Sequence, residues 1–213
     1  MKLYNFVRSS ASYRVRIALA LKGLDCELLP VHLARNEQFA EAFAAIAPAQ
    51  LVPLLDTGEA VLSQSLAIIE YLDEVHPEPR LLPGSALDRA RIRALAQSVA
   101  CEIHPLDNLR VLRYLVRDMK VTEDDKNRWY AHWVETGLEA LEKQLAGHPR
   151  TGRYCHGDTP TLADCTLVPQ IANAQRMKCR LDHVPTVMRV YAECMTLAAF
   201  SATHPSAYPD AAA

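Results

Sequence analysis

Two adjacent serines, Ser9 and Ser10, lie where a predicted strand ends and a predicted helix begins. A helix N-terminus carries partial positive charge and a hydroxyl can donate a hydrogen bond, so both would favour the thiolate form of a thiol bound there. Serine is also a common N-cap residue, and one of these serines could have that role alone. The two interpretations are compatible, because a capping geometry leaves neighbouring N–H groups facing the same space.

Another predicted helix begins at Gln64 and Ser65. The free N–H groups of a first helical turn, together with the helix dipole, can receive a carboxylate. The alternative is that this dipeptide only caps its helix.

Three arginines could bind carboxylates on a ligand: Arg8, beside the serine pair, Arg110, after Asn108 and Leu109, and Arg176. Guanidinium binds a carboxylate through two parallel hydrogen bonds, so three such groups would suit a dianionic ligand. Each could instead be a solvated surface arginine, as most of the 23 Lys and Arg residues must be.

The elements that would position these residues form two different patterns. The first part of the chain alternates predicted strands, at 2–6, 26–31, 52–56 and 60–62, with predicted helices at 12–22, 37–46 and 64–75. This βαβαββα order is typical of an α/β domain. Residues 76–84 (HPEPRLLPG) then carry three prolines and a glycine, which disfavour regular structure and predict a domain boundary.

Beyond that boundary the apolar residues repeat every three or four positions, which predicts an all-helical domain. Thr161 and Asp164 form a capping pair before one of these apolar runs, and they predict a helix start. We expect a first domain over residues 1–80, a linker over 81–87, an all-helical domain over 88–213, and a loosely ordered tail over 206–213.

Composition excludes several classes of function. The 213 residues are 50% hydrophobic with a formal net charge of −2, which favours a packed core and offers no field for nucleic acid or anionic membranes. The six cysteines are scattered singly, without the spacing of a zinc site, so we expect reduced thiols and no metal. No stretch has the length of a membrane span or the pattern of a signal peptide, so we expect a cytoplasmic protein.

Several motifs together resemble the zeta-class glutathione transferases. They are S-S-A-S-Y-R-V-R-I-A-L at 9–19, Val52-Pro53, Q-S-L-A-I-I-E-Y-L at 64–72, P-L-D-N-L at 105–109 and Q-I-A-N-A-Q-R at 170–176. The match covers nearly the whole chain. It implies the glutathione transferase fold, in which a thioredoxin-like domain that binds glutathione precedes an all-helical domain.

The resemblance also implies roles for individual residues. Ser9 would activate the glutathione thiol with help from Ser10, and Gln64 and Ser65 would receive the γ-glutamyl carboxylate. A cis bond before Pro53 would let the Val52 backbone pair with the cysteinyl unit. Further contacts to glutathione are implied for Ala11, Gln38, His104, Asn108 and Arg110, and the substrate would meet Arg8, Arg110 and Arg176.

Two positions depart from the family pattern, and a third has an open role. Ala11 stands where the family often has cysteine, and Arg110 stands where animal relatives have a small residue. An added arginine suggests a substrate whose second carboxylate lies closer to the double bond, as in maleylpyruvate compared with maleylacetoacetate. His104 could be structural, could contact glutathione, or could transfer a proton.

The implied activity is glutathione-dependent cis-trans isomerisation of maleylpyruvate to fumarylpyruvate, or of maleylacetoacetate to fumarylacetoacetate, through reversible thiolate addition to the double bond. The setting would be aromatic-acid degradation, and the enzyme would be a homodimer acting on a small dianionic keto acid. Two alternatives remain: a transferase that conjugates glutathione to small halogenated acids, and a glutathione-binding protein without catalysis.

Overall fold

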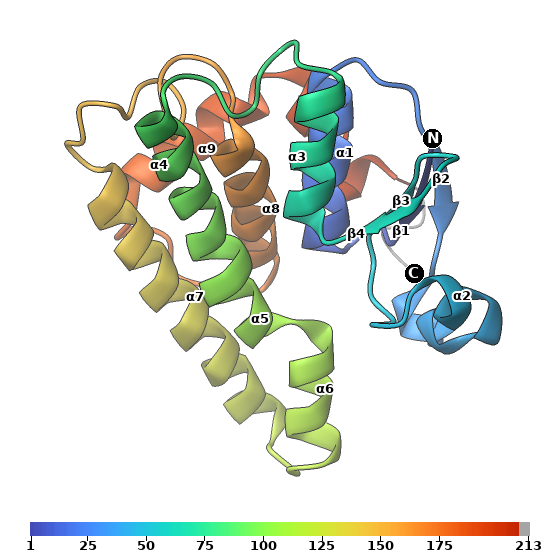
Figure 1. Ribbon diagram of the computed structural model, residues 1–213. Helices are drawn as coiled ribbons and strands as arrows, with labels where there is room; N and C mark the ends of the chain where they lie inside the picture. Colours follow the sequence, from blue (N-terminus) through green and yellow to red (C-terminus); the bar gives the residue numbers. More distant parts are fainter. Residues whose placement is uncertain (209–213) are drawn as a thin grey trace. The chain divides into compact units, whose positions relative to one another are not determined.

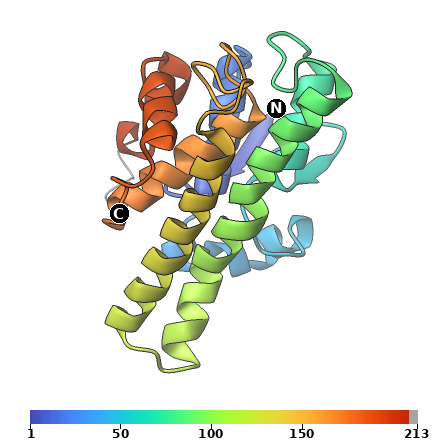
Figure 2. The same cartoon turned by 90° about the vertical axis from the view of Figure 1, so that its left-hand side faces the viewer.

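The computed structural model describes residues 1–208, which divide into two compact units (Figures 1 and 2). Met1–Leu82 and the segment from Met195 onward form the first unit, and Pro83–Cys194 form the second. The boundary between Leu82 and Pro83 falls inside the predicted linker. The helical domain expected over 88–213 ends at Cys194, and residues 195–208 group with the first unit.

The first unit is a mixed sheet with helices on both faces, as the βαβαββα pattern predicts (Figure 1). The strand order is β2-β1-β3-β4, with β1 and β2 parallel and the other two pairings antiparallel. The elements are β1 (Lys2–Asn5), α1 (Ser10–Leu21), β2 (Glu27–Pro30), η1 (Leu33–Arg35), η2 (Glu37–Phe39), α2 (Glu41–Ile46), β3 (Leu54–Asp56), β4 (Val61–Ser63), α3 (Ser65–Val75), α10 (Ala198–Ser201) and η4 (Pro205–Ala207).

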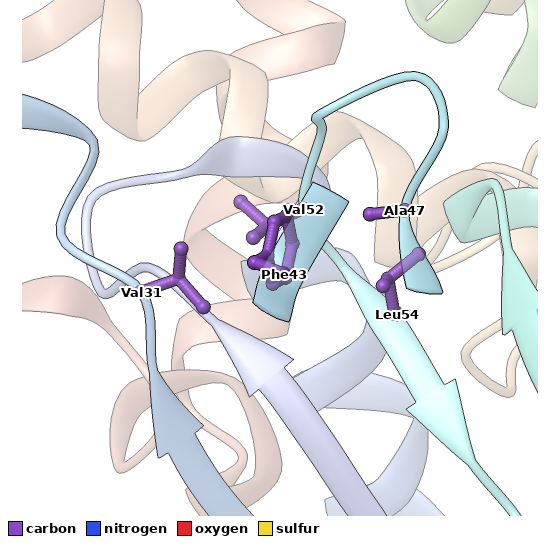
Figure 3. Close-up of a cluster of buried hydrophobic side chains, with 5 residues drawn as sticks. All are labelled: Val31, Phe43, Ala47, Val52 and Leu54. Atoms are coloured by element: carbon purple, nitrogen blue, oxygen red, sulfur yellow. The ribbon is translucent and has the colours of Figure 1, made fainter. Parts of the chain in front are cut away.

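The two faces of this sheet follow from strand alternation. Tyr4 and Leu54 are cross-strand partners on the face covered by α2, where the Tyr4 ring lies 5.9 Å from the ring of Phe43. Figure 3 shows the apolar cluster that forms there, made of Val31, Phe43, Ala47, Val52 and Leu54. The alternate positions Leu3 and Leu55 are fully buried on the opposite face, where α1 and α3 lie side by side (Figure 1).

The predicted helix over 37–46 is wrong, because Ala40 has an extended backbone (φ −61°, ψ 139°) that separates η2 from α2. Both Gln38 and Phe43 are buried. In one continuous helix these residues, five positions apart, would point about 140° away from each other. The break at Ala40 lets both side chains enter the interior.

The last segment is attached to the first unit by polar contacts with α1. The Tyr13 hydroxyl donates to the Phe200 carbonyl at 2.6 Å, and Arg16 donates to the Thr203 carbonyl from Nε and from a terminal nitrogen. The Arg16 guanidinium also lies 5.1 Å from the centre of the Tyr208 ring. The expectation of a loose tail is therefore wrong for residues 206–208, and its remaining part, 209–213, lies outside the described residues.

The second unit is all-helical, as the apolar periodicity predicts. In both views α7 runs beside the continuous stretch from α4 to α5 (Figure 2). Its elements are α4 (Ala86–Gln97), the π-helical η3 (Ser98–Ile103), α5 (His104–Asp107), α6 (Leu109–Arg117), α7 (Glu123–Leu145), α8 (Leu162–Arg176) and α9 (Pro185–Met195).

The start of α8 is the predicted capping box, and it is fully buried. Asp164 accepts hydrogen bonds at 2.8 Å from the backbone N–H and the hydroxyl of Thr161, and at 2.8 Å from the backbone N–H of Cys155. Burial raises the pKa of Asp164, while these donors oppose the rise. The carboxylate thus satisfies buried N–H groups that have few other possible partners.

We expect Asp164→Ala to lower the free energy of unfolding by about 3 kcal/mol, because it leaves buried N–H groups unpaired. Chemical denaturation would measure the loss. Asp125→Ala is the surface control, because the Asp125 carboxylate accepts a hydrogen bond from the Thr122 hydroxyl at the exposed start of α7. A smaller loss for Asp164→Ala than for Asp125→Ala would contradict the importance of burial.

His156 predicts a pH dependence of stability. Burial and then the nearby Arg91 charge lower its pKa from 6.5, against the opposing effect of Asp88. The unfolded chain therefore takes up this proton at a higher pH than the folded chain, so stability is lost as pH falls through about 6.5. Between pH 7 and pH 5, we expect the free energy of unfolding to decrease less in His156→Gln than in the parent protein, as measured by denaturation at each pH. An equal decrease in both proteins would contradict this assignment.

Candidate functional site

The serine pair lies at the start of α1, as predicted. Ser9 is the N-cap, and its Oγ accepts a hydrogen bond from the Ser12 N–H at 3.2 Å. A serine hydroxyl that accepts one hydrogen bond still has its own proton to donate. Ser10 begins the helix and is buried, whereas Ser9, Arg8 and Ala11 are half-buried. Ser9 therefore caps the helix, as one of the two interpretations predicts, and its hydroxyl keeps a proton to donate.

The second helix start, at α3, is joined to α1 by a buried arginine. Ser65 is the first residue of α3 and is 6% exposed, and its Oγ accepts a hydrogen bond from Arg14 at 3.2 Å. Gln64 precedes it with a positive φ of 69° and an exposed side chain. A carboxylate at this helix start would meet free N–H groups and, close by, the charge of Arg14.

Arg14 was not among the site residues predicted from the sequence. Its only signal is that Arg14 and Arg16 alternate with apolar residues at the start of the run from Val15 to Leu19, which leaves α1 no continuous polar face. Both arginines are 2% exposed. Charged residues that alternate with apolar ones in such a helix must be buried, and a buried charge needs hydrogen-bond partners. This alternation could have identified Arg14 from the sequence.

Two further candidates in the first unit have different surroundings. Gln38 is 5% exposed, and its side-chain oxygen accepts no hydrogen bond from residues 1–208. Buried amide oxygens normally have a donor, so this atom can receive one from a ligand. Val52 lies in the apolar cluster of Figure 3, and the bond between Val52 and Pro53 is cis, as the resemblance implied.

In the second unit, His104, Asn108 and Arg110 come together where α5 meets α6. Asn108 caps α6 by accepting a hydrogen bond from the Arg110 N–H at 3.0 Å. Its amide nitrogen lies 3.3 Å from His104 Nε2, and His104 Nδ1 lies 3.6 Å from Asp107 Oδ1. Gln170 of α8 donates to Asp107 Oδ2 at 2.8 Å. Asp107 and Gln170 belong to quoted motifs, but they were not among the predicted site residues.

Arg176 is the last residue of α8, and its side chain is exposed and donates to Asn173 at 3.4 Å. Burial and then the charge of Asp107 raise the pKa of Tyr130, whereas the charge of Arg176 lowers it. Arg176 and Asp107 therefore both act on the same tyrosine of α7. Of the three candidate arginines, Arg110 and Arg176 lie in the second unit and Arg8 in the first.

Within residues 1–208, no group of three or more His, Cys, Asp or Glu side chains is arranged to hold a metal ion. None of the helices described has both the length and the apolar character needed to cross a membrane. All six cysteines are free thiols, and four of them are buried.

Comparison with known proteins matches both units to one family. Residues 1–74 match the glutathione S-transferase N-terminal domain, and residues 127–191 match the glutathione S-transferase C-terminal domain. Maleylpyruvate isomerase of a Ralstonia species is 51% identical over 212 residues, covering 100% of both chains.

Comparison with solved structures identifies the same family. A holo maleylpyruvate isomerase, described as a bacterial zeta-class glutathione S-transferase, has a TM-score of 0.96 at 51% identity, with 99% of each chain covered. A maleylacetoacetate isomerase of Anaeromyxobacter dehalogenans, with dicarboxyethyl glutathione and citrate in its active site, has a TM-score of 0.86 at 44% identity, covering 99% of this chain and 96% of that one. This chain therefore belongs to the zeta class of the glutathione S-transferase family.

Proposed function

We propose that the protein is a glutathione-dependent cis-trans isomerase that converts maleylpyruvate to fumarylpyruvate, with maleylacetoacetate as the related substrate. The observation that carries the proposal is the hydrogen-bonded connection between α1 and the start of α3 in the first unit. Ser9 caps α1, Ser65 opens α3, and the buried Arg14 connects the two. A thiol and a carboxylate of one small ligand can be received at two such helix starts.

The residues of the first unit fit glutathione. Ser9 supplies a hydroxyl proton at the positive end of α1, which favours a thiolate. The N–H groups at Ser65 suit the γ-glutamyl carboxylate, and the unpaired oxygen of Gln38 suits an N–H donor toward the glycyl end. When bound, glutathione supplies a thiolate that adds reversibly to the cis double bond, so that the carbons can rotate about a single bond before the thiolate leaves.

The arginines support an acidic substrate. Arg8 adjoins the serine pair, while Arg110 and Arg176 belong to the second unit. Guanidinium groups bind carboxylates and stabilise negative charge that develops on a keto acid as its double bond is attacked. Arg110 favours maleylpyruvate, whose second carboxylate lies closer to the double bond. The same proposal includes a cytoplasmic homodimer.

The direct test is to follow the keto-enol absorbance of maleylpyruvate and of maleylacetoacetate with and without glutathione, and to identify the products. We expect conversion to the fumaryl isomers with glutathione unchanged, and a higher kcat/KM for maleylpyruvate. Consumption of glutathione by a halogenated acid, without isomerisation, would instead identify a conjugating transferase. Binding of immobilised glutathione with neither reaction would identify a protein that only binds it.

We expect Ser9→Ala to lower kcat/KM by about 10-fold to 100-fold, because the bound thiolate loses a hydrogen bond to a charged group. The ultraviolet thiolate band should also show a raised pKa of the bound glutathione thiol. Ser9→Thr keeps both the hydroxyl and the cap, so it should retain most of the rate.

The control for Ser9→Ala is Ser85→Ala, which removes the N-cap of α4. Each variant should lose about 1 kcal/mol of stability, but only Ser9→Ala should lose activity. Full isomerase activity in Ser9→Ala would exclude this serine as the thiolate donor.

A further inference from the structure

At the junction of α5 and α6, the contacts of Asn108 identify which of its side-chain atoms faces each neighbour. The Arg110 backbone N–H can be accepted only by an oxygen, so the atom that caps α6 at 3.0 Å is Oδ1. The amide nitrogen is then the atom 3.3 Å from His104 Nε2. The capping role of Asn108 thus fixes the direction of its contact with the imidazole.

The direction of that contact fixes the protonation of His104. An amide nitrogen only donates, so Nε2 must accept with its lone pair and the ring is the neutral form that carries its proton on Nδ1. Nδ1 faces Asp107 Oδ1 at 3.6 Å, close enough for attraction between the N–H and the carboxylate. Both ring nitrogens are therefore engaged by residues of this chain.

Asp107 is held in place from the other side. It is 6% exposed, and Gln170 of α8 donates to its second oxygen at 2.8 Å. A buried carboxylate is costly unless donors surround it. Gln170 donates to Asp107, and Asn108 donates to His104 Nε2. His104 Nδ1 faces Asp107, as does the buried Tyr130, whose pKa the charge of Asp107 helps to raise.

We infer that His104 is a neutral positioning residue, held between Asp107 and Asn108, that orients the cap of α6 and with it Arg110, and that it is not a proton-transfer residue. The chain of contacts connects α8, through α5, to the helix that carries Arg110. Neighbouring contacts keep α5 in place: Trp129 of α7 donates to the Leu106 carbonyl at 2.8 Å. A side chain at Gly137 of α7 would approach Ile103 to 2.3 Å, so only glycine allows this close packing.

The kinetic consequence rests on the isomerase activity proposed above. Glutamine offers an amide donor and a carbonyl acceptor but has no proton to exchange near neutral pH. We expect His104→Gln to lose less of kcat/KM than His104→Ala, which should lose about tenfold, the equivalent of one orienting hydrogen bond to a charged group. The pH profile of kcat should be the same in His104→Gln as in the parent enzyme.

A proton-transfer residue would give a different result. Both variants would then lose about 100-fold or more, and the pH profile would lose an ionisation. Unchanged kinetics in His104→Ala would also overturn the inference, because a positioning residue cannot be removed without effect.

The protonation state can be tested without substrate or glutathione, so it stands or falls apart from the proposed activity. Nitrogen-15 spectra of the ligand-free protein at pH 7 should show His104 protonated on Nδ1 alone. Asn108→Asp keeps the cap but replaces the amide donor by a second carboxylate oxygen, so His104 should become doubly protonated between two carboxylates.

The matched control is Asn108→Ser, which also caps α6 but adds no charge. The His104 ring in this variant should carry a single proton. A parent ring protonated on Nε2, or an unchanged ring in Asn108→Asp, would overturn the inference, whatever the kinetics show.

Discussion

The burial of two guanidinium groups along α1 is the constraint on which the first unit depends. Arg14 and Arg16 are each 2% exposed, and a buried charge is tolerated only when hydrogen bonds replace its water. Burial lowers the pKa of Arg16 to about 10, because the charged form loses the water that would solvate it. The neighbouring elements must therefore bring their acceptors to fixed places around α1.

Those acceptors are the parts of the chain that form the candidate site. Arg16 holds Asn5 at the end of β1 and the Val7 carbonyl, immediately before Arg8 and Ser9. Arg14 holds Ser65 at the start of α3. The loop that carries Ser9 and the helix that begins at Ser65 are thus positioned by one helix, and the same helix binds the last segment through Thr203.

The second unit uses buried carboxylates for the same purpose. Asp164 fixes the start of α8, and Asp107 connects α8 to the junction of α5 and α6. The first unit thus relies on the buried arginines of α1, and the second relies on Asp164 and Asp107. In each unit, hydrogen bonds to buried charged side chains fix the elements that carry the candidate site residues.

The sequence by itself determined the alternation of strands and helices, the capping box at Thr161 and the positions of Ser9 and Ser65 at helix starts, because these depend on local periodicity and on capping chemistry. Its motifs also identified the family. Only the tertiary structure decided the break at Ala40, the return of the last segment to the first unit, and the partners of Arg14 and Asp107. Those features depend on which distant atoms satisfy a buried polar group, and neither spacing nor periodicity along the chain records that choice.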